Sequence, residues 1–311
     1  MKEEFEIIQY PHVDSLNLFI VDIEYRTLHV HNELELNLIL KGEAVIISKD
    51  TTHSITSGQM ILLNPNQPHE IFAKDAPVRI LCVQIMPRLL RHVYPDIKSI
   101  QFDQALPFLI MEEETIKAIK NMFYQLAFHY LRKAAHYELA CMGYVYSLIH
   151  QLMENIPYHF ISKEEFNTIF LRMERINRFI QYVSENYSGR VRLSTLAEKE
   201  GLSISYLSHF IKEHLNYTFQ EYVDLVRFNC ARRLLRTSDK RILDICIESG
   251  FSDPRYMNRA FLKHTGMLPE AFRKHYGVNQ NIATLSSIHS FQQFFGLNES
   301  LEILQDYFAT Q

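Results

Sequence analysis

Apolar and polar residues alternate along the first third of the chain, up to about residue 86. The stretch ELELNLILKG shows the pattern most plainly, because its leucines share one face and its polar residues share the other. A period of two residues predicts β-strands. Turn signals at Gly42, Gly58 and 64–66 separate these strands. The strand spacing favours a small antiparallel barrel or sandwich.

From Glu112 onward the apolar residues recur at helical spacing. We expect residues 111–156 to form two helices, one stripe packing on the barrel and the other pairing two copies of the chain into a homodimer. Burial of both stripes within one chain is the alternative. The first stripe comprises Ile116, Ile119, Phe123, Leu126 and Tyr130, and the second comprises Tyr137, Cys141, Tyr144, Leu148 and Leu152.

Residues 242–276 predict a short helix, a tight turn and a second helix. Gly250 ends the first helix, Ser252 is expected to cap the second, and the second begins at about Asp253. Two helices joined in this way form a helix-turn-helix motif, whose second helix enters the major groove of DNA. Arginine pairs with guanine and asparagine with adenine. Core residues are Met257, Ala260 and Phe261, and candidate DNA-binding residues are Arg255, Asn258 and Arg259.

A second copy of this plan lies upstream, at residues 193–217. Thr195 and Glu198 suggest a capping box, Gly201 makes the turn, and Ser203 caps the next helix. A helix over 220–236 joins the two copies, so both second helices are expected to reach successive major grooves on one face of DNA. The second helix is expected to bury Tyr206, Leu207, Phe210 and Ile211 and to present Ser205, Ser208, His209 and Lys212 to DNA.

The charge distribution supports this interpretation. The whole chain carries a net charge of −4, which alone does not indicate a DNA-binding protein. Residues 170–276, however, contain 18 Lys/Arg and 12 Asp/Glu, whereas residues 1–169 contain 14 and 21. Positive charge is therefore concentrated in the segment that is expected to contact phosphates.

These motifs resemble the AraC/XylS family of bacterial transcription regulators. The second motif matches the family pattern at eight positions and departs from it at Cys246, Met257, Leu262 and Leu268. The resemblance implies a seven-helix DNA-binding domain, an effector-binding barrel, and recruitment of RNA polymerase at promoters. A sugar or glycoside is the effector class that the resemblance favours. The matching positions are Gly250, Phe251, Tyr256, Arg259, Phe261, Gly266, Pro269 and Arg273.

The barrel segment resembles the cupin fold, in which two histidines, a glutamate and a third histidine converge on one ion. The second cupin motif is one residue short here, and its inner glycine is absent. We therefore predict a small-molecule pocket, no bound metal and no cofactor; a solvated strand face and a metal-binding cupin enzyme are the alternatives. The candidate effector-binding residues are His29, His31, Glu35, Asn37 and His69, with Tyr10, Tyr25, Arg26 and Gln84 as weaker candidates.

The predicted division of the chain follows from these patterns. We assign 1–110 to a cupin-like barrel, 111–156 to helices that dimerise, 157–169 to a linker, 170–276 to the DNA-binding domain, and 277–311 to a helical extension. The fold class is thus a multidomain α+β protein.

The sequence contains no apolar run of membrane-spanning length and begins without a signal peptide, so the cytoplasm is the expected compartment. The four cysteines lie singly in apolar surroundings and are expected to be buried thiols. The chain is predicted to be a non-enzymatic transcription regulator. Activation of carbohydrate-utilisation genes is favoured over repression. A regulator of stress or virulence genes whose barrel only dimerises is the second possibility.

Overall fold

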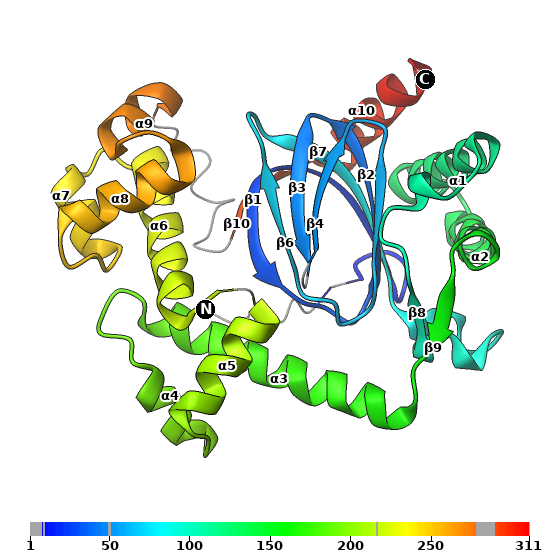
Figure 1. Cartoon of the computed structure of the whole chain (residues 1–311). Helices are drawn as coiled ribbons and strands as arrows, with labels where there is room; N and C mark the ends of the chain where they lie inside the picture. The colour runs from blue at the N-terminus through cyan, green and yellow to red at the C-terminus, as the bar shows by residue number, and fades with distance from the viewer. Residues whose placement is uncertain (1–7, 9, 49–50, 216, 278–289, 311) are drawn as a thin grey trace.

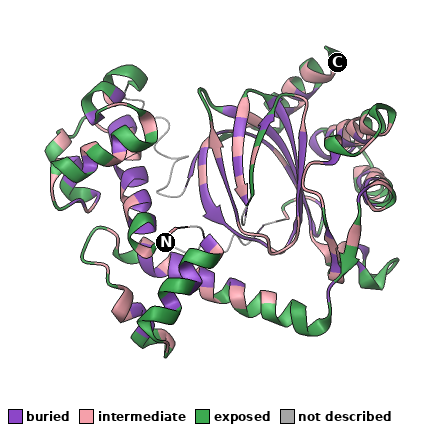
Figure 2. Ribbon diagram, viewed as in Figure 1, coloured by how far each residue is buried: buried purple, intermediate pink, exposed green. Residues whose placement is uncertain are grey.

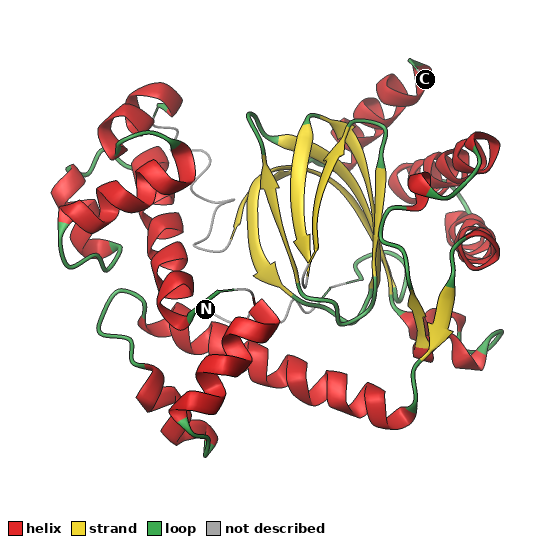
Figure 3. Cartoon of the chain, viewed as in Figure 1, coloured by secondary structure: helices red, strands yellow, loops and turns green. Residues whose placement is uncertain are grey.

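The alternating segment folds into the strands of an antiparallel barrel (Figures 1 and 3). A computed structural model describes residues 8, 10–48, 51–215, 217–277 and 290–310. The strands follow one another in the order β4-β3-β6-β1-β7-β2-β5. Their bounds are β1 (Leu16–His29), β2 (Leu34–Lys41), β3 (Glu43–Ser48), β4 (Thr51–Thr56), β5 (Met60–Leu63), β6 (His69–Ala73) and β7 (Val78–Ile85).

Both faces of the sheet are apolar, which explains why nearly every residue of β2 is buried. One set of side chains, including Ile39, Ile46 and Ile80, forms a cluster inside the barrel. The opposite set, including Leu36 and Leu81, forms a second cluster with the helices outside it. Alternation along the strand separates the two sets.

Two helices, α1 (Glu113–Arg132) and α2 (Tyr137–Asn155), cover the outer face of the barrel (Figure 1). Phe123 and Leu148 are fully buried there, and most of both predicted stripes lies in the same cluster. The prediction that one stripe pairs two copies of the chain is therefore wrong. The outer leucines of β2 provide apolar surface for both stripes, so both stripes are buried within one chain.

Three short 3₁₀ helices precede α1, at Pro87–Leu90, Pro95–Ser99 and Pro107–Leu109.

The segment predicted as a linker, 157–169, is folded. Strand β9 (Tyr158–Phe160) pairs with β8 (Ile100–Phe102), and helix α3 (Lys163–Asn186) begins three residues later. Ser162 caps this helix, and Glu165 completes a capping box. This local signal starts the helix despite the nearby proline and charges.

Seven helices form the described part of the second domain, and they enclose two apolar cores. Figure 2 shows that burial is concentrated where these helices face one another and the barrel. The first core lies among α3 to α6, and the second among α6 to α9. After α3, the bounds are α4 (Leu193–Glu200), α5 (Ile204–Leu215), α6 (Phe219–Thr237), α7 (Ile242–Glu248), α8 (Pro254–Thr265) and α9 (Pro269–Tyr276).

Both helix-turn-helix corners form where the glycines predict them. Gly201 and Gly250 have φ of 65° and 84°, a region that favours glycine. The caps differ in part from the prediction. Asp253, not Ser252, accepts the hydrogen bond at the start of α8, and α4 begins after Arg192 without a side-chain cap. Ser203 does cap α5, accepting from the Tyr206 amide at 3.1 Å.

The C-terminal extension, predicted to be helical, contains a strand as well as a helix. Strand β10 (Ser290–Phe294) pairs antiparallel with β1, and helix α10 (Leu297–Ala309) packs on α1 (Figure 1). The long β1 leaves an edge of backbone groups that β10 satisfies. Residues 278–289 lie outside the described residues.

Candidate DNA interface and effector site

The residues predicted to contact DNA lie on the outward faces of α5 and α8. Each helix packs its apolar side chains into one of the two cores: Leu207 and Phe210 of α5, and Met257 and Phe261 of α8. The opposite face of each helix is therefore turned toward solvent. Asn258 is half-buried. The remaining six predicted residues are exposed: Ser205, Ser208, His209, Lys212, Arg255 and Arg259.

The two arginines of α8 differ in their contacts. Arg255 donates two hydrogen bonds to the carboxylate of the cap residue Asp253, from its Nε at 3.0 Å and from one terminal nitrogen at 2.9 Å. Arg259 lies over the ring of Tyr256, 5.3 Å from its centroid. Arg255 must therefore release an ion pair before it binds a base edge. Arg259 needs only to leave a weaker cation–π contact.

Tyr206 departs from the prediction, because it is 48% exposed and not part of the core. Its hydroxyl accepts a hydrogen bond from Arg175 at 2.9 Å. Helical spacing identifies the apolar stripe but not its outer margin, where a tyrosine keeps its hydroxyl in contact with water or a cation. Tyr206 thus links α5 to the arginine-bearing face of α3.

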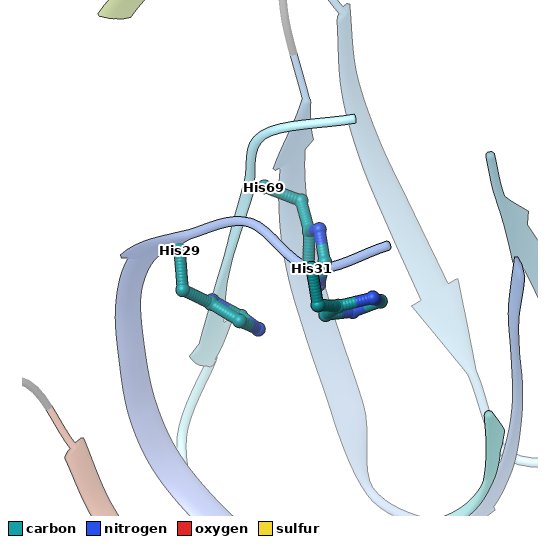
Figure 4. Close-up of side chains that lie close together, drawn as sticks. All are labelled: His29, His31 and His69. Carbon is teal, nitrogen blue, oxygen red and sulfur yellow. The ribbon is translucent and has the colours of Figure 1, made fainter. Parts of the chain in front are cut away.

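The predicted effector residues converge at one end of the barrel. His29 ends β1 and is the cross-strand partner of His69, which begins β6; His31 follows two residues after His29 (Figure 4). The ring centroids of His29 and His69 are 4.1 Å apart, and those of His31 and His69 are 5.2 Å apart. All three rings are buried.

Glu35 is the centre of a buried polar network beside these rings. Its Oε2 lies 2.9 Å from His31 Nε2 and accepts a hydrogen bond from Gln84 at 2.8 Å. Its Oε1 lies 3.6 Å from His69 Nε2 and accepts from Asn37 at 2.6 Å. All five predicted residues are thus close together or joined by hydrogen bonds, and a solvated strand face is excluded because each is buried.

The environment sets opposite protonation states in this cluster. Burial raises the pKa of Glu35, but hydrogen bonds and charge from His31 and His69 outweigh it, so the net pKa is well below its usual value. Burial holds the pKa of His29 well below its usual range, and the neighbouring His69 lowers it further. At neutral pH the site therefore contains a carboxylate and a neutral imidazole.

The network includes one residue that the sequence did not single out. Asn17 donates to Gln84 at 2.9 Å, and Gln84 was only a weak candidate. Strand register brings them together, because Asn17 and Gln84 are partners across β1 and β7, and Glu35 and Gln84 across β2 and β7. Tyr25, another weak candidate, lies elsewhere and stacks against Phe291 of β10.

The histidine-bearing segments contact the DNA-binding domain with their opposite faces. Leu28 and Val30, which alternate with His29 and His31, belong to the apolar core of α3 to α6. Glu70, which follows His69, accepts a hydrogen bond from Tyr217 at 3.0 Å. On both β1 and β6, a histidine of the cluster is therefore next in sequence to a residue that contacts the first helix-turn-helix unit.

The second helix-turn-helix unit meets the barrel through arginines of α6. Arg232 lies 3.5 Å from the ring centroid of Tyr25, and Arg236 pairs with Glu24 and lies over Phe291. Two arginines of the basic segment are thus engaged by the barrel. The segment's excess positive charge is not all directed at DNA.

A separate cleft of about 850 Å³ lies between the barrel rim and α3. Polar residues line much of it, including Gln67, Asp103 and Arg172. None of the predicted effector residues lines this cleft. The buried cluster and the cleft are therefore different places in the structure.

Family models match both parts of the chain. Residues 22–149 match the AraC-like ligand binding domain, and residues 196–275 match a helix-turn-helix domain. The chain belongs to the AraC family. It consists of a cupin-like barrel and a helical domain that contains two helix-turn-helix motifs.

Similar proteins include other regulators. The melibiose operon regulatory protein of Escherichia coli K12 is 23% identical over 82% of this AraC-family chain and 87% of its own length. An HTH-type transcriptional regulator of Staphylococcus aureus is 24% identical over 89% of the chain, which spans only 35% of that relative.

Solved structures with similarity to the chain include ToxT of Vibrio cholerae. It is 16% identical, with a TM-score of 0.42 over 83% of this chain and 97% of that one. The C-terminal domain of AraT of Geobacillus stearothermophilus is 28% identical, with a TM-score of 0.32 over 33% of this chain and 86% of that one. In the described part of the chain, no helix is long and apolar enough to cross a membrane.

Proposed function

We propose that this regulator binds two successive major grooves with α5 and α8 and responds to an effector at the buried cluster of the barrel. The observation that carries the proposal is the pair of outward faces on two similar helix-turn-helix units, joined by one helix. Helix α6 has 19 residues. At 1.5 Å per residue its length is about 28 Å, close to one turn of B-DNA. A rigid connection of this length suits neighbouring grooves.

The effector response rests on the alternation of side chains between the two faces of β1 and β6. His29, His31 and His69 face the cluster, while Leu28, Val30 and Glu70 contact the first helix-turn-helix unit. An effector that fits one arrangement of the cluster better than another shifts the population of domain orientations. A sugar or glycoside as the effector is supported by the similarity to the melibiose operon regulatory protein and by the polar chemistry of the cluster.

Activation by recruiting RNA polymerase, and a homodimer, both follow from the family resemblance. Leu139 and Tyr146 support the dimer, because they lie on the outer face of α2 and are 75% and 36% exposed. We propose the division into a barrel at 1–110, covering helices at 111–156 and a DNA-binding domain that includes 170–276. DNA as the target makes the cytoplasm the proposed compartment.

The direct test measures affinity for DNA fragments selected by the full-length protein from a random library. Arg259→Ala is expected to weaken binding by about 1–3 kcal/mol and to relax the preference at one base position. Arg91→Ala is the matched control, because Arg91 is exposed on the barrel domain and far along the chain from both motifs. Equal affinities and equal selected sequences for wild type and Arg259→Ala would remove Arg259 from the interface.

A further inference from the structure

The cleft between the barrel rim and α3 has the size of a small-molecule site. Its volume of about 850 Å³ lies within the range of about 300–1,000 Å³ that is usual for ligand pockets. Figure 1 shows α3 running beneath the barrel, from the β8–β9 ribbon to the first helix-turn-helix unit. Residues of the barrel, of this ribbon and of α3 all line the cleft, and His214 adds a contribution from α5. The cleft is therefore bounded by both domains.

Hydrogen bonds hold the barrel wall of the cleft in place. Asn64 bonds the backbone of Phe102 in both directions, donating from Nδ2 and accepting at Oδ1, each at 2.9 Å. Gln67 donates to Ser48 at 2.7 Å and accepts from the Asn64 amide at 2.8 Å. These bonds tie β8 to the loop between β5 and β6. A wall that is already fixed loses little conformational freedom when a ligand binds.

The opposite wall combines a fixed helix start with apolar surface. The capping box of Ser162 and Glu165 holds the beginning of α3, directly after β9. Ile161, Met173 and Ile176 also line the cleft and are buried. These three side chains offer apolar surface beside the polar wall of the barrel. Apolar surface with a few polar groups is the usual composition of a ligand pocket.

Some polar groups that line the cleft are not engaged by other parts of the described chain. The side-chain amides of Gln101 and Asn66 form no hydrogen bond with a described residue, and Arg172 and Glu164 form no ion pair with one. The amides donate and accept, the guanidinium only donates, and the carboxylate only accepts. A hydroxyl group both donates and accepts, so a molecule with many hydroxyls matches this mixture.

The charges in the cleft argue against an ionic ligand. The carboxylates of Asp103, Glu164 and Glu165 line it together with one guanidinium, that of Arg172. An anion bound to Arg172 would be repelled by this excess of carboxylates. A polycation would have to compete for two of them, because Asp103 pairs with His159 at 2.7 Å and Glu165 caps α3. A neutral ligand avoids both costs.

We propose that the cleft binds a neutral polyhydroxylated molecule of the size of a disaccharide or trisaccharide. Its hydroxyls bond Gln101, Asn66 and Arg172, and its C–H faces cover the apolar side chains of the α3 wall. The site is separate from the buried cluster, where Glu35 is already bonded by neighbouring amides. Because both domains bound the cleft, the ligand favours the domain orientation in which the cleft keeps its shape. Only this effect on DNA binding rests on the proposed function.

Isothermal titration calorimetry on the full-length protein, with maltose, lactose, sucrose and raffinose as separate probes, tests the proposal. We expect at least one sugar to bind at one site per chain. Thr168→Trp puts a large side chain into the cleft from an exposed position of α3 and should abolish binding. Gln101→Ala and Arg172→Ala should each weaken binding by about 10-fold. Arg91→Ala is the matched control, because Arg91 is exposed and does not line the cleft; its affinity should equal that of wild type.

Circular dichroism checks that each variant is folded, and Gln101→Ala decides the matter if Thr168→Trp is not. Failure of all four sugars to bind overturns the proposal, as does wild-type affinity in both Gln101→Ala and Arg172→Ala. Binding of glucose 6-phosphate or spermidine in place of the neutral sugars would also overturn it. A sugar whose binding is lost in Glu35→Gln and kept in Thr168→Trp would overturn the cleft site while supporting the proposed effector site. DNA affinity measured with and without sugar reports on the proposed function separately.

Discussion

The two helix-turn-helix units share one plan but meet the barrel differently. The first unit shares its apolar core with Leu28 and Val30 of β1, whereas the core of the second unit contains no barrel residue among those described. The second unit contacts the barrel through Arg232 and Arg236 of α6. A shared apolar core can be separated only by exposing its side chains to water, whereas the second unit shares no such core with the described part of the barrel. The first unit is therefore expected to move with the barrel, and the second to be adjustable relative to it.

The turns of the two units also differ, and one substitution in each should show it. A Cβ on Gly250 would lie 2.3 Å from the Tyr187 carbonyl oxygen, whereas a Cβ on Gly201 would meet nothing within 4 Å. Both glycines have positive φ, which alone costs alanine about 1 kcal/mol. We expect Gly250→Ala to lower the free energy of unfolding by about 3–5 kcal/mol and Gly201→Ala by about 1 kcal/mol, measured by urea denaturation. Equal losses would show that the second turn is not the more tightly packed one.

The shared core predicts that damage to β1 spreads to the first unit. Leu28→Ala removes a buried side chain and should cost about 2–4 kcal/mol of stability. Hydrogen exchange should then accelerate in α5 more than in α8. Leu18→Ala on the same strand is the control, because Leu18 belongs to the cluster with α1 and α2. If Leu18→Ala and Leu28→Ala accelerate exchange in α5 equally, the first unit is not tied to the barrel through Leu28.

Acid should weaken the second unit selectively. His264 on α8 stacks on Phe228, and burial together with Lys263 and Arg232 lowers its pKa to about 4. The unfolded imidazole takes up a proton near pH 6.5, so the unfolded state binds more protons between about pH 4 and 6.5. Stability is therefore fully present above that window and is lost as pH falls through it. Because the residue remains partly exposed, the expected loss is about 1 kcal/mol.

The check is urea denaturation at a series of pH values. His264→Asn should flatten the loss between pH 6.5 and 4 relative to wild type. An unchanged pH profile in that variant would assign the loss to other groups.

Local patterns in the sequence predicted the helices well and the contacts between domains poorly. Helical spacing with Gly201 and Gly250 identified both helix-turn-helix units, because turns depend on nearby residues. Nothing near β10 indicates that it pairs with β1, and nothing near Leu28 indicates that it joins the core of another domain. Such contacts depend on chain segments far apart in the sequence.

The buried polar cluster was predicted in membership but not in arrangement, and its role in binding an effector stays a prediction. Strand alternation placed His29, His31, Glu35 and Asn37 on one face, and all four are buried with His69. The convergence of three rings, and the roles of Gln84 and Asn17, follow from the register of β1 with β6 and β7. Register is fixed by the packing of the whole barrel and not by any one strand.

Hydroxyl-radical footprinting of the full-length protein on its selected DNA distinguishes recognition by two helices from recognition by one. We expect two protected patches one helical turn apart on one face of the duplex. Arg259→Ala should weaken only the patch bound by α8, and His209→Ala only the patch bound by α5. A single protected turn, or two patches that weaken together in both variants, would contradict recognition by two separate helices.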